Sequence, residues 1–114
     1  MKVLVSSKGF QITPQLRDEV TSFVTEAFLR WELQIKQVRA FLADENGPKK
    51  GNDRKIQLIV DLRRRPLAVA RASGTQWKNV LHHATQRAIY TISRQVERRR
   101  SHSGRPSMAG ADTP

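Results

Sequence analysis

The spacing of apolar residues changes along this 114-residue chain, and that spacing constrains the fold more than any other feature. Apolar residues recur every three or four positions in two long segments, as on one face of an α-helix, and they alternate in shorter segments, as in a strand with one buried side. The first helix should begin at Thr13-Pro14, because threonine caps a helix and proline fits its first position. The second should begin after Ser73-Gly74-Thr75 and run to about Arg100. Strands are expected at residues 2–6, 35–43, 54–63 and 67–72.

The order of these segments, β-α-β-β-β-α, indicates a fold class. Two helices that are apolar along one face each need a surface to cover, and a sheet with one buried face supplies it. The first two strands, joined through a helix, should be parallel neighbours, and the last three should form an antiparallel meander. We therefore predict an α+β two-layer sandwich, in which a four-stranded mixed sheet carries both helices on one face.

Two segments show neither helical nor strand spacing. Residues 44–53 are rich in turn-forming and charged residues and should form a mobile loop between two strands. Residues 101–114 have no periodicity and should be a disordered basic and polar tail. The chain is therefore expected to hold one α+β domain over residues 1–100, followed by this tail.

Basic residues are concentrated in the second half of the chain. The formal net charge is +11, with 21 lysines and arginines against 10 acidic residues. Residues 1–53 carry a net charge of only +1, whereas residues 54–114 carry 13 basic and 3 acidic residues, a net charge of +10. Arginine predominates there, and its planar guanidinium matches phosphate oxygens, so the expected partner is a polyanion. Nucleic acid is the leading candidate, and an anionic membrane is the alternative.

The second predicted helix carries the strongest candidate site. Cationic residues and one tyrosine recur there at intervals of three and four, which places them in one row beside the core-facing side. Such a row can hold phosphates and offer a ring for stacking, and it lacks the acidic partners four residues away that a solvent-facing helix usually has. The row consists of His83, Arg87, Tyr90, Arg94 and Arg98.

Two clusters of three arginines extend this candidate surface. Arg98, Arg99 and Arg100 should project beyond the sheet, because the helix is longer than the strands that it covers. Arg63, Arg64 and Arg65 precede Pro66 in a predicted turn and form a second candidate contact. The alternative for this turn is that its charges only keep a hairpin soluble.

No set of residues indicates an enzyme. His82 and His83 are adjacent, so on a helix they point in different directions and cannot bind one metal ion together, and His102 falls in the tail. The sequence has no glycine-rich phosphate loop and no HExxH motif. We therefore expect no catalytic residue, metal site, cofactor or small-molecule substrate. Because cysteine is absent and every apolar run is short, we also expect a cytoplasmic protein that is not bound to a membrane.

Several short motifs resemble the family of ribosome hibernation promoting factors and ribosome-associated translation inhibitors, which has also carried a sigma-factor modulation label. They are Ser7-Lys8, Ile12-Thr13-Pro14, Leu16-Arg17 with Val20, and the helical segment from Ser93 to Arg98. With the element order, the resemblance covers residues 2 to about 100. It departs from the family at residues 75–78, where relatives usually have an acidic residue, a methionine and an aromatic residue. The chain would be a short form, without the C-terminal domain that pairs ribosomes in long members.

The resemblance implies a fold similar to double-stranded RNA-binding domains and a function on the ribosome. It implies that the domain binds the small subunit between head and body, contacts 16S rRNA through basic residues, and inhibits translation or promotes hibernation by steric occlusion. Carried over by position, Lys8 and Arg17 flank the ITP segment, and Arg87 and Arg94 match basic positions of the closing helix. Two alternatives remain: a general binder of double-stranded RNA, and a regulatory module that binds an acidic protein surface.

Overall fold

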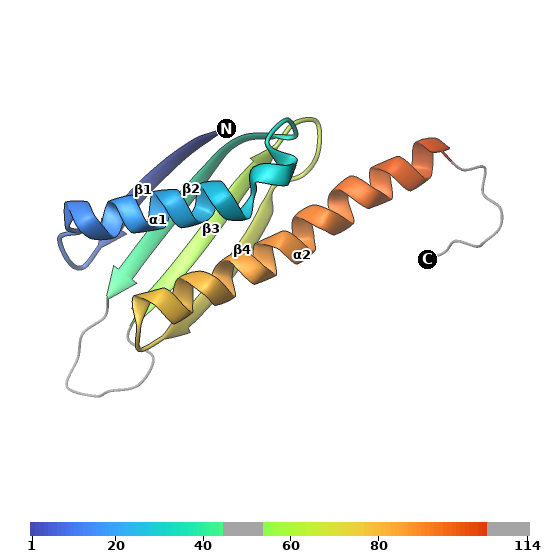
Figure 1. Cartoon of the computed structure of the whole chain (residues 1–114). Helices are drawn as coiled ribbons and strands as arrows, with labels where there is room; N and C mark the ends of the chain where they lie inside the picture. Colours follow the sequence, from blue (N-terminus) through green and yellow to red (C-terminus); the bar gives the residue numbers. More distant parts are fainter. Residues whose placement is uncertain (45–53, 105–114) are drawn as a thin grey trace.

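The computed structural model describes residues 1–44 and 54–104, with side chains as far as Glu97. The predicted order of strands and helices is confirmed, and so is the α+β class (Figure 1). Residues 45–53 and 105–114, where a mobile loop and most of the tail were predicted, lie outside the described residues. In chain order the elements are β1 (Lys2–Lys8), α1 (Pro14–Ala27), the 3₁₀ helix η1 (Leu29–Trp31), β2 (Ile35–Asp44), β3 (Arg54–Leu62), β4 (Ala68–Gly74) and α2 (Trp77–Gly104).

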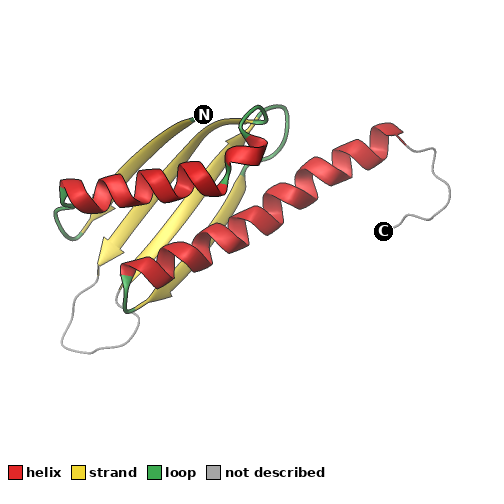
Figure 2. Ribbon diagram, in the orientation of Figure 1, coloured by secondary structure: helices red, strands yellow, loops and turns green. Residues whose placement is uncertain are grey.

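The four strands form one mixed sheet in the order β1-β2-β3-β4. β1 runs parallel to β2, while β2, β3 and β4 form an antiparallel meander, as predicted. Both helices lie against the same face of the sheet, and no described helix covers the opposite face (Figure 2). We call this opposite face the open face.

Side chains alternate between the two faces of the sheet as predicted. Val38, Ala40 and Leu42 of β2 are buried beneath the helices, whereas the ring of Phe41 between them is 38% exposed on the open face. The core therefore lies between the sheet and the two helices. Helical spacing predicts a core-facing side of α2 made of Trp77, Leu81, Ala84, Ala88, Ile92 and Val96. All of these are buried except Trp77, which is half-buried, and the structure adds Val80, which is fully buried.

Small side chains line the contact between α2 and β4. β4 contributes Ala68, Ala70 and Ala72 to the buried face, and α2 contributes Ala84 and Ala88. Because alanine carries only a methyl group, a helix can lie closer to such a strand than longer side chains would allow. The flank of α2 is thereby brought beside the edge of β4, against which the helix packs.

α1 ends at Ala27, although apolar residues at helical spacing continue as far as Trp31. Thr13 caps it as expected, with its hydroxyl oxygen accepting a hydrogen bond from the Leu16 N–H at 3.1 Å, but the helix ends at Ala27 and η1 follows. Side chains three residues apart eclipse in a 3₁₀ helix, so Phe28 and Trp31 both turn into the core.

α2 is longer than predicted and outruns the sheet. It has 28 residues and ends at Gly104. The helix therefore includes the first four residues of the tail that was predicted to begin at residue 101. A helix of this length spans roughly 42 Å, and Val96 is its last buried residue among those with described side chains. Figure 1 shows the C-terminal part of α2 extending past the sheet.

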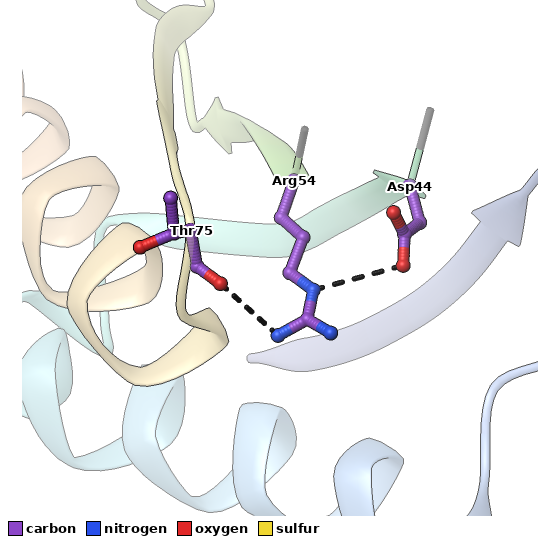
Figure 3. Close-up of polar contacts among 3 residues, drawn as sticks. All are labelled: Asp44, Arg54 and Thr75. Carbon is purple, nitrogen blue, oxygen red and sulfur yellow. Dashed lines mark hydrogen bonds and ion pairs between the residues drawn. The ribbon is translucent and has the colours of Figure 1, made fainter. Parts of the chain in front are cut away.

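A polar cluster joins three elements where α2 begins (Figure 3). Arg54 Nε lies 3.6 Å from Asp44 Oδ2, and Arg54 Nη1 donates a hydrogen bond to the carbonyl oxygen of Thr75 at 3.2 Å. The guanidinium carbon of Arg54 also lies 5.5 Å from the ring centroid of Trp77, which stacks on Phe10 with 5.4 Å between ring centroids. Arg54 thus ties the ends of β2 and β3 to the first turn of α2.

Replacing Arg54 with alanine should lower the free energy of unfolding by about 1 kcal/mol, because the ion pair, hydrogen bond and ring contact that it loses are all partly exposed to water. Urea denaturation followed by circular dichroism measures the change. Lys36→Ala removes an exposed lysine from β2 and serves as the control, with an expected change within about 0.5 kcal/mol. Equal free energies of unfolding for the two variants would show that the cluster around Arg54 does not stabilise the fold.

Candidate nucleic-acid interface

The row predicted on α2 is exposed as far as the side chains are described. His83, Arg87, Tyr90 and Arg94 are all exposed, and Tyr90 has 63% of its surface open to solvent. The backbone of Arg98 continues the helix, but its side chain is not described. Four of the five predicted members are therefore available to a partner.

Tyr90 and Arg94 form one unit within this row. Arg94 Nη1 lies 3.4 Å from the hydroxyl oxygen of Tyr90, and its guanidinium carbon lies 5.5 Å from the centroid of the tyrosine ring. The two side chains border a hollow of about 210 Å³ that Thr91 and Gln95 complete. A cation held beside an exposed ring can accept a phosphate while the ring contacts a neighbouring base or sugar.

Arg87 reaches from α2 to the edge of the sheet. Its Nη1 donates a hydrogen bond of 2.6 Å to the backbone carbonyl oxygen of Arg71, in the edge strand β4. The guanidinium of Arg87 therefore lies between the row on α2 and the open face. Arg87 can reach the edge strand because the small alanine side chains between α2 and β4 keep the flank of the helix close to the strand.

A basic depression lies on the open face next to Arg87, and we call it the sheet-face hollow. Its volume is about 580 Å³, and four cationic side chains line it with no acidic residue among the lining residues. The exposed ring of Phe41 forms part of its surface. The cationic side chains come from β1, β3, β4 and α2, and they are Lys8, Lys55, Arg71 and Arg87.

The sequence predicted only part of this hollow. Lys8 and Arg87 were candidate residues, and the structure brings them to one depression. Arg71 and Lys55 were missed, although the alternation within their strands places both side chains on the open face. The sequence of one strand does not reveal its partners. In the sheet, Phe41 lies opposite Gln57, and Gln57 lies opposite Arg71.

The described arginines of this surface have no carboxylate partner. Within residues 1–44 and 54–97, Arg71, Arg87 and Arg94 form no ion pair. Acidic side chains gather instead around a groove of about 480 Å³ between the two helices, which Asp18, Glu19 and Glu26 of α1 help to line. The protein thus has a basic side along α2 and β4 and a more acidic side along α1.

The other predicted residues lie apart from the sheet-face hollow. Arg17 is exposed on α1, but its Nη1 donates a hydrogen bond of 2.7 Å to the carbonyl oxygen of Val5, which ties it to β1. The side chains of Arg99 and Arg100 are not described, although their backbone is helical.

Arg63, Arg64 and Arg65 form the turn between β3 and β4, at the end of the sheet opposite the start of α2 (Figure 1). Arg64 adopts a φ of 59°, a left-handed conformation that is uncommon for a residue with a side chain. Arg65 Nη1 donates to the carbonyl oxygen of Arg63 at 3.3 Å, so part of its hydrogen-bonding capacity is used within the turn. The structure does not bring this turn into the hollow.

Neither a metal site nor a membrane span is found in the part of the chain that is described. No three histidine or acidic side chains lie close enough together to hold a metal ion there. No described helix is both long enough and apolar enough to cross a bilayer.

The fold and its basic, partly aromatic surface define a two-layer α+β protein suited to a polyanionic partner. No protein-family model matches the sequence, and no curated protein matches it. Among solved structures, a ribosomal subunit interface protein from Coxiella burnetii has a similar fold, with a TM-score of 0.64, 15% identity, and coverage of 82% of this chain and 96% of that chain.

A second solved structure with this fold is the N-terminal domain of Protein Y from Thermus thermophilus. Its TM-score is 0.64 and its sequence identity 18%, and the match covers 82% of this chain and 93% of that chain. Both structures share the fold that the sequence motifs and the order of elements led us to expect. At these identities the likeness establishes the fold, so the resemblance is confirmed at that level.

Proposed function

We propose that this protein is a ribosome-associated factor that binds 16S rRNA in the decoding region of the small subunit. The observation that carries the proposal is the position of Arg87, which belongs to the exposed row on α2, donates a hydrogen bond to the edge strand β4 and also lines the basic sheet-face hollow. The arginines on this surface have no carboxylate partners among the described residues, so their charge is available to phosphates. The fold shared with a ribosomal subunit interface protein supports the ribosome as the source of those phosphates.

The proposed mechanism is steric and needs no chemical step. The core holds α2 against the sheet, so the backbone positions that carry the exposed cations stay fixed relative to one another, and only their side chains must be ordered on binding. A rigid domain seated on the rRNA would occupy space that mRNA and tRNA need. Translation would stop while the factor is bound and resume when it leaves.

Sedimentation tests this proposal. The protein, mixed with purified small subunits at about 0.1 M salt and run on a sucrose gradient, should move with the subunits, and binding should weaken steeply as salt increases. It should also inhibit translation in vitro, and subunits loaded beforehand with mRNA and tRNA should bind it poorly. Failure to move with small subunits or whole ribosomes would contradict the proposal.

Two results would favour the alternative functions. Equal affinity for an arbitrary RNA duplex and for small subunits in the same buffer would indicate a general binder of double-stranded RNA. A complex that survives nuclease treatment and contains no ribosomal protein would indicate a module for an acidic protein.

A further inference from the structure

The open face carries an aromatic ring that the core does not use. Phe41 points away from the helices and exposes 38% of its surface, while its neighbours Ala40 and Leu42 are buried on the other face. In the sheet it pairs with Ser6 of β1 and Gln57 of β3. An aromatic ring bordered by small and polar side chains offers a flat face to a ligand.

Cations surround this ring on two sides. Lys8 reaches the hollow from β1, and Arg71 and Arg87 reach it from the β4 side. The hydrogen bond from Arg87 to the carbonyl oxygen of Arg71 holds one guanidinium at the rim of the hollow. The chemistry assembled here is an exposed aromatic face with positive charge at its border, and the lining contains no negative side chain.

From this arrangement we infer that the sheet-face hollow binds one unpaired nucleotide of the RNA, with its base stacked on Phe41 and its flanking phosphates held by Lys8, Arg71 and Arg87. The inference rests on the proposed function and assigns a second subsite to it. A phosphate backbone bound along the row on α2 reaches this hollow by crossing the edge of β4 at Arg87.

The occupant must be unpaired, because a base inside a duplex presents only its edges, and its faces are covered by its neighbours. A base that has left the stack exposes a face for an aromatic side chain, and such stacking tolerates any base. The volume of about 580 Å³ lies within the range of pockets that hold small molecules, so it can accommodate one nucleotide. Gln57 borders the hollow beside Phe41 and can donate or accept a hydrogen bond at the edge of the base.

The test measures how the full chain binds a single-stranded 12-nucleotide RNA of mixed sequence that carries a fluorescent end label and one 2-aminopurine. Phe41→Leu keeps an apolar side chain but removes the ring, so its affinity should fall roughly five-fold to 100-fold, with loss of the quenching that stacking produces. Phe41→Tyr should keep both affinity and quenching. Val69→Ala is the matched control, because Val69 is 40% exposed on the same face but does not line the hollow, and it should bind like the wild type.

Two outcomes would overturn the inference. The first is equal affinity of the Phe41→Leu and Val69→Ala variants with unchanged quenching. The second is an affinity loss in Phe41→Leu that Phe41→Tyr shares. Circular dichroism and thermal unfolding of each variant show whether an affinity loss reflects misfolding.

Sedimentation of the wild type with small subunits separates this inference from the proposed function. If the wild type moves with the subunits and Phe41→Leu binds them equally well, the nucleotide subsite is wrong and the ribosomal function stands. If the oligonucleotide binds through Phe41 but the wild type does not move with ribosomes, the subsite stands and the ribosomal function is wrong.

Discussion

Replacing Arg87 and Arg94 together with alanine should weaken binding to small ribosomal subunits roughly 100-fold, because each arginine is expected to make a charge-assisted hydrogen bond to a phosphate. The logarithm of the affinity should also depend less steeply on the logarithm of the salt concentration, by up to about one unit for each lost contact. Both side chains are exposed, so the fold should survive. Affinity measured between about 50 and 200 mM salt provides both numbers.

The control for this experiment removes the same charge elsewhere. Lys36 lies on β2 and Lys78 lines the groove beside the acidic side of α1, and both are exposed. The double variant Lys36→Ala and Lys78→Ala lowers the net charge by two, so any difference between the two double variants is due to position. An unchanged salt dependence after loss of Arg87 and Arg94 would remove the row on α2 from the interface.

Replacing Phe28 with alanine should cost the protein about 3–5 kcal/mol of its free energy of unfolding, the usual cost of emptying a fully buried aromatic position. Phe28 is completely buried at the point where α1 gives way to η1, and its N–H donates to the carbonyl oxygen of Val24 at 3.0 Å. Domains of this size are stable by about 5–15 kcal/mol, so the variant should unfold at a much lower urea concentration.

Phe23 supplies a matched comparison on the same helix. It is 37% exposed and contacts His82 edge-on with 6.4 Å between ring centroids, so Phe23→Ala should cost about 1 kcal/mol or less. Similar losses for the two variants would mean that η1 does not lock the end of α1 into the core.

The sequence was sufficient for the fold because its signals are local. A threonine and a proline mark the start of α1, and alternation in residues 54–62 marks a strand wherever it pairs. The end of α1 was less predictable for a physical reason. Phe28 and Trp31 are three residues apart, and that spacing fits both a continuing α-helix and a 3₁₀ turn.

Part of the candidate site could be predicted from local spacing, and part could not. The row on α2 could be predicted, because helical periodicity alone places Arg87, Tyr90 and Arg94 on one side. The sheet-face hollow could not, because it depends on pairing between strands distant in the sequence, which brings Phe41 and Arg71 onto one surface. It depends also on the close packing of α2 on β4, which sets how far Arg87 reaches. Neither condition leaves a pattern within one segment.

The hydrogen bond between Arg87 and the backbone of Arg71 has a consequence for solubility. An edge strand offers unpaired carbonyl and amide groups to strands of other molecules, which makes it a starting point for aggregation. On β4 a guanidinium already occupies one of these carbonyl oxygens. A second copy that approached to pair along this edge would have to displace that group and bring like charges together, so the arginine deters self-association as the protein becomes concentrated.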